Sequence, residues 1–105
     1  MNRKFKSIGK DVCIDDMCRI SYPEVVSIGN HVAIDCFTYI STSITLGDYI
    51  HIARNVTIIG GKDASLTMGN FTNIGDGSRI VCASDDFKRG LISPIVPIEN
   101  RFLIN

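Results

Sequence analysis

Residues 46–58 read LGDYIHIARNVTI, and a large aliphatic residue stands at every sixth position of this stretch. Leu46, Ile52 and Ile58 carry the rhythm, which is neither the 3.6-residue period of a helix nor the two-residue period of a simple strand. The residues between them are mostly polar or charged. The stretch therefore belongs to a structure that buries about one large side chain in every six residues.

The same spacing continues in both directions. Successive six-residue units, or hexads, begin at Ile8, Ile14, Ile20, Ile28, Ile34, Ile40, Leu46, Ile52, Ile58, Met68, Ile74 and Ile80. The fifth residue of ten of these hexads is small or apolar, as at Val32 and Val56. A coiled coil would place its apolar residues three and four apart, whereas β-branched Ile and Val pack well in strands. The repeat therefore predicts short strands separated by turns.

A longer period of three hexads lies within the six-residue repeat. On one side of this 18-residue unit the aliphatic is followed by glycine, at Gly9, Gly29, Gly47 and Gly69. Glycine followed by Asn or Asp suits a tight corner, and we expect φ to turn positive there. Short strands, corners and a three-sided unit predict an all-β parallel β-helix of about four 18-residue coils.

Stacking of these coils predicts three inward ladders of side chains. They are Ile8/Ile28/Leu46/Met68, Ile14/Ile34/Ile52/Ile74 and Ile20/Ile40/Ile58/Ile80. Each buried side chain contributes roughly 1.5–3 kcal/mol before conformational entropy is subtracted. We expect all twelve inside a single domain, with coils over 8–84 and a loop and tail over 85–105.

Three departures from the rhythm begin on the third side of the coil. The step from Ile20 to Ile28 has two extra residues, the step from Ile58 to Met68 has four, and the rhythm ends after Ile80. Insertions are tolerated wherever they leave the stacking of coils undisturbed, and a common edge also suits a binding surface. We therefore expect loops along one edge of the prism.

Composition excludes several classes of protein. Lys and Arg together number 11, as do Asp and Glu, so no overall field attracts nucleic acid or an anionic membrane. The sequence shows neither an apolar run of membrane-spanning length nor a signal-peptide pattern. The four cysteines lack the spacing of a metal site. Idle thiols in a reducing cytoplasm are the expected state.

The repeat [aliphatic]-[Gly/Asp/Ser/Ala]-x-x-[small/apolar]-x over 8–84 resembles that of the hexapeptide-repeat acyltransferases. The resemblance implies a left-handed β-helix and homotrimers with active sites between subunits. The stretches GDYIHIARNVTIIGG, GDGSRIVCASDDF and SPIVP look more narrowly like bacterial enzymes that acylate sugars for cell-surface polysaccharides. Later coils in that family help to bind coenzyme A, so the resemblance implies that this chain corresponds to the amino-terminal portion.

The resemblance implies an acetyl-CoA-dependent acyltransferase that acetylates a hydroxyl or amine of a sugar or nucleotide sugar, without a metal. It singles out no residue for binding the coenzyme. The alternative is a non-catalytic oligomerisation or structural piece of such an enzyme. The γ-class carbonic anhydrases share the repeat, but two histidines on different turns are too few for their metal site. An ice-binding solenoid would present aligned threonines, and Thr42 is followed 18 residues later by Gly60.

His51 is the candidate catalytic base. Acyl transfer needs a group that takes the proton of the acceptor, and the ordinary pKa of histidine lies near neutrality. His51 is the sixth residue of its hexad, and we expect it at the corner between sides one and two. The stretch HIA resembles the histidine-bearing stretch of the sugar acyltransferases, while the alternative for His51 is an ordinary polar corner residue. His31, the fourth residue of its hexad, is expected to be a solvated residue on side one.

Asp85, Asp86 and Asn55 are candidates for binding the substrate. The two aspartates follow the last coil, where they form either a solvated turn or a site that holds sugar hydroxyls or orients the histidine of a neighbouring subunit. Asn55 is expected near His51 together with Arg54, facing phosphate or carbonyl oxygens. Arg54 equally suits an ion pair with Asp76, one coil further on.

Overall fold

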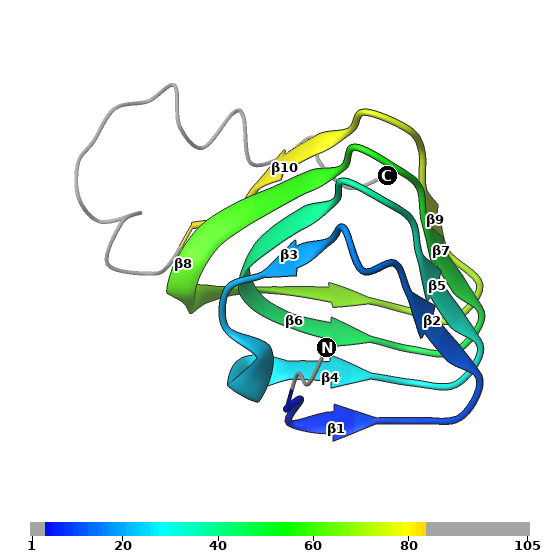
Figure 1. Cartoon of the computed structure of the whole chain (residues 1–105). Coiled ribbons are helices and arrows are strands. Elements are labelled where there is room, and N and C mark those ends of the chain that lie inside the picture. Colours follow the sequence, from blue (N-terminus) through cyan, green and yellow to red (C-terminus); the bar gives the residue numbers. More distant parts are fainter. Residues whose placement is uncertain (1–3, 84–105) are drawn as a thin grey trace.

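Residues 4–83, which the computed structural model describes, form a three-sided prism of stacked coils (Figure 1). The strands are β1 (Ser7–Ile8), β2 (Val12–Ile14), β3 (Arg19–Ile20), β4 (Val26–Ile28), β5 (Val32–Ile34), β6 (Tyr39–Leu46), β7 (Ile50–Ile52), β8 (Thr57–Met68), β9 (Asn73–Ile74) and β10 (Arg79–Val81). A short 3-10 helix, η1 (Pro23–Val25), stands between β3 and β4. In Figure 1 the coils run counterclockwise as they recede from the amino-terminal coil, which is the left-handed sense. The predicted left-handed parallel β-helix is confirmed.

Two parallel sheets make the three sides. Side two is the four-stranded sheet with the order β2-β5-β7-β9. The second sheet has six strands and bends around a corner, because β6 and β8 run along side three and continue onto side one. Side one therefore contains β1, β4 and the ends of β6 and β8, while side three contains β3, the beginnings of β6 and β8, and β10.

The strand register reproduces the three predicted ladders. On side one Ile8 pairs with Ile28, Ile28 with Leu46, and Leu46 with Met68. The ladders of sides two and three pair in the same way. Ile8 is nevertheless 51% exposed, because it lies on the first coil at the open end of the stack. The expectation that all twelve aliphatic residues lie inside is therefore wrong at Ile8.

Two threonines are buried among these apolar side chains. The hydroxyl of Thr38 donates to the carbonyl of Ala53 at 2.8 Å and accepts from the N–H of Val56 at 3.3 Å. The hydroxyl of Thr42 donates to the carbonyl of Ala64 at 3.0 Å. Each hydroxyl keeps a partner inside the prism, so the penalty for burying an unsatisfied polar group does not arise.

The chain turns at the fourth residue of the hexad rather than at the glycine. Positive φ values of 57–62° occur at Asp11, His31, Phe37, Tyr49, Asn55 and Phe71. The glycines at the second position have another role. A Cβ on Gly29 would collide with the carbonyl oxygen of Gly47 and would lie 2.5 Å from Oδ1 of Asp48. The expectation of a positive φ at these glycines is wrong, because the close approach of the next coil is what excludes a side chain.

Side-chain oxygens join the coils at the corner between sides one and two. The N–H of Lys10 donates to Oδ1 of Asn30 at 2.8 Å, and the N–H of Asn30 donates to Oδ1 of Asp48 at 2.8 Å. The N–H of Asp48 in turn donates to Oδ1 of Asn70 at 2.7 Å. The recurring Gly-Asn and Gly-Asp pairs therefore link each coil to the next where the strand pairing is interrupted.

The two insertions lie together at the corner between sides three and one. The first forms η1, and the second is accommodated within β8, where the pairing with β6 shifts register beside Thr42. Nζ of Lys62 in the second insertion lies 3.1 Å from Oε2 of Glu24 in the first. Both insertions thus share one edge as predicted, although the second is a strand irregularity rather than a loop. The predicted loop and tail at 85–105 lie outside the described residues.

A row of small hydroxyl side chains runs along side one. Ser7, Ser27, Thr45 and Thr67 pair in register, one in each coil. Each precedes an inward aliphatic residue by one position, so these side chains point outward. Thr42 points into the prism, so its 18-residue spacing to Gly60 does not reveal this outward row. The row is mixed, with two serines and two threonines.

Candidate active site

His51 occupies the middle of β7, with its side chain on the outer surface of side two. Its neighbours Ile50 and Ile52 are buried, so the imidazole projects to the opposite face of the strand. Ala33 and Asn73 stand beside it in the adjacent coils. The expected corner position is therefore wrong. The corner comes earlier, at Tyr49, whose φ is 59°, and His51 lies on a flat sheet surface instead.

A carboxylate of the preceding coil contacts this imidazole. Nε2 of His51 lies 3.0 Å from Oδ2 of Asp35, and the two side chains are 52% and 50% exposed. Asp35 follows Ile34, which pairs with Ile52, so the carboxylate stands diagonally opposite His51 across the sheet. Asp35 is not among the site residues predicted from the sequence. The 18-residue period was the signal that would have placed it next to His51.

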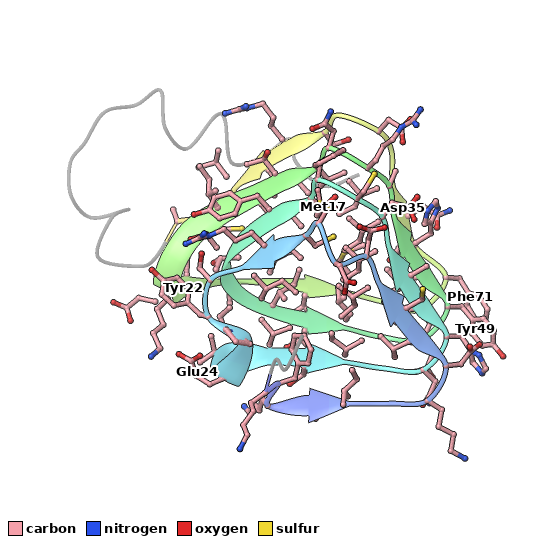
Figure 2. All side chains as sticks on the ribbon, viewed as in Figure 1. Met17, Tyr22, Glu24, Asp35, Tyr49 and Phe71 are labelled. Carbon is pink, nitrogen blue, oxygen red and sulfur yellow. The ribbon has the colours of Figure 1, made fainter. Side chains whose placement is uncertain are left out.

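The pair of His51 and Asp35 has the geometry of an oriented base. An ionised Asp35 accepts the hydrogen bond, so the proton of a neutral imidazole resides on Nε2. That arrangement leaves Nδ1 as a proton acceptor. Because both groups are about half exposed, a substrate has access to the imidazole without rearrangement of the sheet. In Figure 2 Asp35 lies on the outer face of side two.

His31 is engaged in a different structure, at the corner between sides one and two. Its Nδ1 lies 2.8 Å from Oδ2 of Asp11. Its ring stacks on Tyr49 with a centroid distance of 4.6 Å, and Tyr49 stacks on Phe71 at 5.0 Å. The two aromatic residues lie one above the other at this corner in Figure 2. His31 is exposed as expected, but it belongs to a stacked column that joins coils rather than to a freely solvated surface.

Among the described residues, the other site residues predicted from the sequence do not join the pair of His51 and Asp35. Asn55 lies at the corner between sides two and three with a φ of 59°. The neighbouring Arg54 forms the structural ion pair with Asp76, and its Nε lies 3.4 Å from Oδ2 of that residue. Among residues 4–83, the hydrogen bond of the His51 ring is made with Asp35 and not with Asn55. Asp85 and Asp86 lie outside the described residues.

Within residues 4–83, no group of three or more His, Cys, Asp or Glu side chains is arranged to hold a metal ion. The same part of the chain forms no helix that is long and apolar enough to cross a membrane.

The cysteines differ in their surroundings. Cys13 is exposed, whereas Cys18 is buried and its thiol donates to the carbonyl of Asp35 at 2.8 Å. Burial raises the pKa of the Cys82 thiol.

The chain is similar in sequence to a known acyltransferase. The chain is 37% identical to a dTDP-4-amino-4,6-dideoxy-D-glucose acyltransferase from Escherichia coli over 100 residues, or 90% of this chain and 50% of the relative. It thus spans about half the length of the curated relative that it matches. No family model matches the chain.

Solved structures of AntD, an N-acyltransferase from Bacillus cereus, share the fold. A variant of AntD in complex with dTDP-4-amino-4,6-dideoxyglucose and coenzyme A matches with a TM-score of 0.72 and 38% identity, covering 91% of this chain and 51% of AntD. The complex with dTDP and 3-hydroxybutyryl-CoA matches with a TM-score of 0.62 and 42% identity, covering 66% of this chain and 36% of AntD. These matches confirm the resemblance to the hexapeptide-repeat acyltransferases.

Proposed function

We propose that this chain carries the catalytic base of an acyltransferase that transfers an acyl group from acyl-CoA to the amine of a dTDP-linked amino sugar. The single observation that carries the proposal is the hydrogen-bonded pair of His51 and Asp35 on an accessible sheet surface. The acyltransferases of E. coli and B. cereus, which are 37–42% identical to this chain over the aligned regions, support the choice of reaction. The substrate of the E. coli enzyme and the ligands of the AntD complexes support a 4-amino-4,6-dideoxy sugar as the acceptor and coenzyme A as the carrier of the acyl group.

In this reaction the amine nitrogen attacks the thioester carbonyl. The new C–N bond forms, the C–S bond breaks, and the products are an amide and the free thiol of coenzyme A. Nδ1 of His51 takes the proton that the amine loses and returns it to the departing thiolate. Asp35 is a positioning residue, which holds Nε2–H and stabilises the imidazolium while the proton resides on the ring. Backbone N–H groups are proposed to stabilise the oxyanion.

The finer features of the proposal follow from the family resemblance. Acetyl-CoA is the proposed donor, and the product is proposed to serve synthesis of a cell-surface polysaccharide in the cytoplasm. A homotrimer would supply the second wall that the open surface around His51 lacks. Asn55, Asp85 and Asp86 are proposed to contact the sugar, the two aspartates from a neighbouring subunit.

The test is turnover of dTDP-4-amino-4,6-dideoxyglucose by the full chain, with acetyl-CoA and 3-hydroxybutyryl-CoA offered in parallel. Thiol release gives the rate, and mass spectrometry of the sugar product identifies the acyl group. Replacing His51 with Ala is expected to reduce kcat about 10²–10⁴-fold, the usual contribution of a general base. His31→Ala is the matched control, since it removes the other histidine of the chain and is expected to retain turnover.

Two outcomes would contradict the proposal. A His51→Ala protein whose turnover stays within about threefold of the parent, well short of a general-base loss, would make His51 an ordinary surface residue. Failure of the parent chain to acylate the sugar with either donor would remove the catalytic proposal and favour the structural alternative.

A further inference from the structure

The outer surface of side three carries a column of polar side chains in register. In the parallel strand register Arg19 lies opposite Tyr39, Tyr39 lies opposite Thr57, and Thr57 lies opposite Arg79. Each precedes an inward isoleucine of the third ladder by one position, so all four side chains point away from the core. Neighbouring strands lie about 4.8 Å apart, which places the two arginines about 14 Å from each other, with the two hydroxyl-bearing residues between them.

The two arginines of this column have no carboxylate partner among the described residues. Neither Arg19 nor Arg79 forms an ion pair with a described residue, whereas Arg54 pairs with Asp76 and Lys62 pairs with Glu24. The second outward column of side three contains Ser21, Ser41, Ile59 and Val81. None of these eight outward positions holds a carboxylate, so within residues 4–83 the two positive charges of this surface are unpaired.

Hydroxyl groups occupy the centre of the surface. The hydroxyl of Ser21 lies 3.5 Å from the hydroxyl oxygen of Tyr39. Hydrogen bonds from Ser21 and Ser41 lower the pKa of Tyr39, and the positive charge of Arg19 adds to the effect. Hydroxyl donors between two guanidinium groups match an anion with several oxygens, because guanidinium groups bind phosphate oxygens in pairs.

We propose that side three binds the diphosphate of a nucleotide sugar, with Arg19 at one end and Arg79 at the other. The identity of the nucleotide, dTDP, rests on the proposed function, while the diphosphate site rests on the arrangement of side three itself. Side three and the His51 surface face different directions, so a sugar held here would meet the His51 of a neighbouring copy rather than its own. That consequence agrees with the proposed trimer.

The total charge of a nucleotide sugar matches the two arginines more closely than the total charge of coenzyme A does. The diphosphate diester of a nucleotide sugar carries about two negative charges, which the two arginines neutralise, whereas free dTDP carries about three because its terminal phosphate is a monoester. Coenzyme A carries an additional phosphomonoester and hence about two further negative charges. Two arginines would leave that excess uncompensated.

The test is calorimetric titration of the full chain with dTDP, and with coenzyme A in a parallel titration. Arg19→Gln and Arg79→Gln are each expected to weaken dTDP binding about tenfold or more, the usual loss for a hydrogen bond to a charged group. Arg54→Gln is the matched control, because it removes an exposed arginine whose charge is already paired with Asp76. Light scattering on every variant confirms that the assembly is unchanged.

Three results would overturn the inference. They are the absence of dTDP binding, an equal loss of dTDP affinity in Arg54→Gln, and a loss of coenzyme A affinity rather than dTDP affinity in the side-three variants. The same experiments distinguish failure of this inference from failure of the proposed acyl transfer. A chain that binds dTDP through the two arginines but acylates no sugar would retain this site and lose the reaction. A chain that acylates the sugar with an unchanged KM in both arginine variants would retain the reaction and lose this site.

Discussion

The backbone N–H of Asn30 donates to Oδ1 of Asp48 in the next coil at 2.8 Å, directly beside a glycine that has no room for a side chain. The contact explains why Gly-Asn and Gly-Asp pairs recur on one side of the repeat. The glycine allows the coils to approach, and the polar residue that follows it bonds them together. The residue types allowed at these two positions of the corner are therefore restricted to glycine and a short polar residue.

The first prediction concerns that constraint. Gly29→Ala is expected to lower the free energy of unfolding by about 1–3 kcal/mol, because the new Cβ meets backbone of the next coil. Gly69 occupies the equivalent position in the last described coil, and a Cβ added there would meet nothing within 4 Å among the described residues. Gly69→Ala is therefore expected to change stability by about 0.5 kcal/mol or less. Urea unfolding of both variants measures the difference, and equal effects would contradict the close-approach explanation.

The second prediction concerns the ladder of side two. Ile52 is completely buried, so Ile52→Ala is expected to cost about 2–5 kcal/mol through lost burial and a residual cavity. Ile8→Ala removes the same atoms from a side chain that is 51% exposed, and it is expected to cost about 1 kcal/mol or less. Thermal unfolding followed by circular dichroism compares the two. An Ile52→Ala protein as stable as the parent would contradict the assigned core.

A third prediction separates the roles of Asp35 and His51. Asp35→Asn keeps the shape of the side chain but removes the charge that stabilises the imidazolium, so kcat is expected to fall at least about tenfold while KM for the sugar changes little. Asp15 stands in the same column one coil earlier, and Asp15→Asn is expected to leave both constants near those of the parent. A change confined to KM in Asp35→Asn would indicate that Asp35 binds substrate instead of positioning the base.

A fourth prediction concerns thiol chemistry. Because burial raises the pKa of Cys82, less of this thiol is ionised at a given pH than for an ordinary cysteine. Its alkylation by iodoacetamide is therefore expected to begin only at higher pH. Exposed Cys13 should react first, and buried Cys18 last. Mass spectrometry of the labelled peptides over a pH series gives the order, and early labelling of Cys82 near neutral pH would contradict it.

The fifth prediction is the homotrimer. Met17 and Phe37 are 61% and 58% exposed on neighbouring coils at the corner between sides two and three. Exposed apolar side chains at this spacing favour contact with another surface, and the family resemblance favours three-fold symmetry. Light scattering at micromolar concentration is expected to report three times the mass of one chain. A monomer would exclude an active site shared between subunits.

The β-helix and its register could be read from the sequence. One aliphatic residue in six, and three hexads to a coil, leave a single way to bring Ile34, Ile52 and Ile74 into line, because a shift by one residue would turn these side chains out to water. The number of residues between successive hexads likewise predicted that both insertions lie at one edge of the prism. These features depend on spacing along the chain, which the sequence displays directly.

The roles of the individual polar residues became visible only in three dimensions. Glycine was expected to supply the positive φ, but Tyr49 and its equivalents adopt that conformation, and Gly29 serves the approach of a neighbouring coil. Asp35 reaches His51 from a different coil, at a distance set by the stacking of strands and the choice of rotamer. Hydrogen bonds and clashes between coils depend on positions in space to within about an ångström. A six-residue period fixes which residues are neighbours, but it does not fix which of their atoms meet.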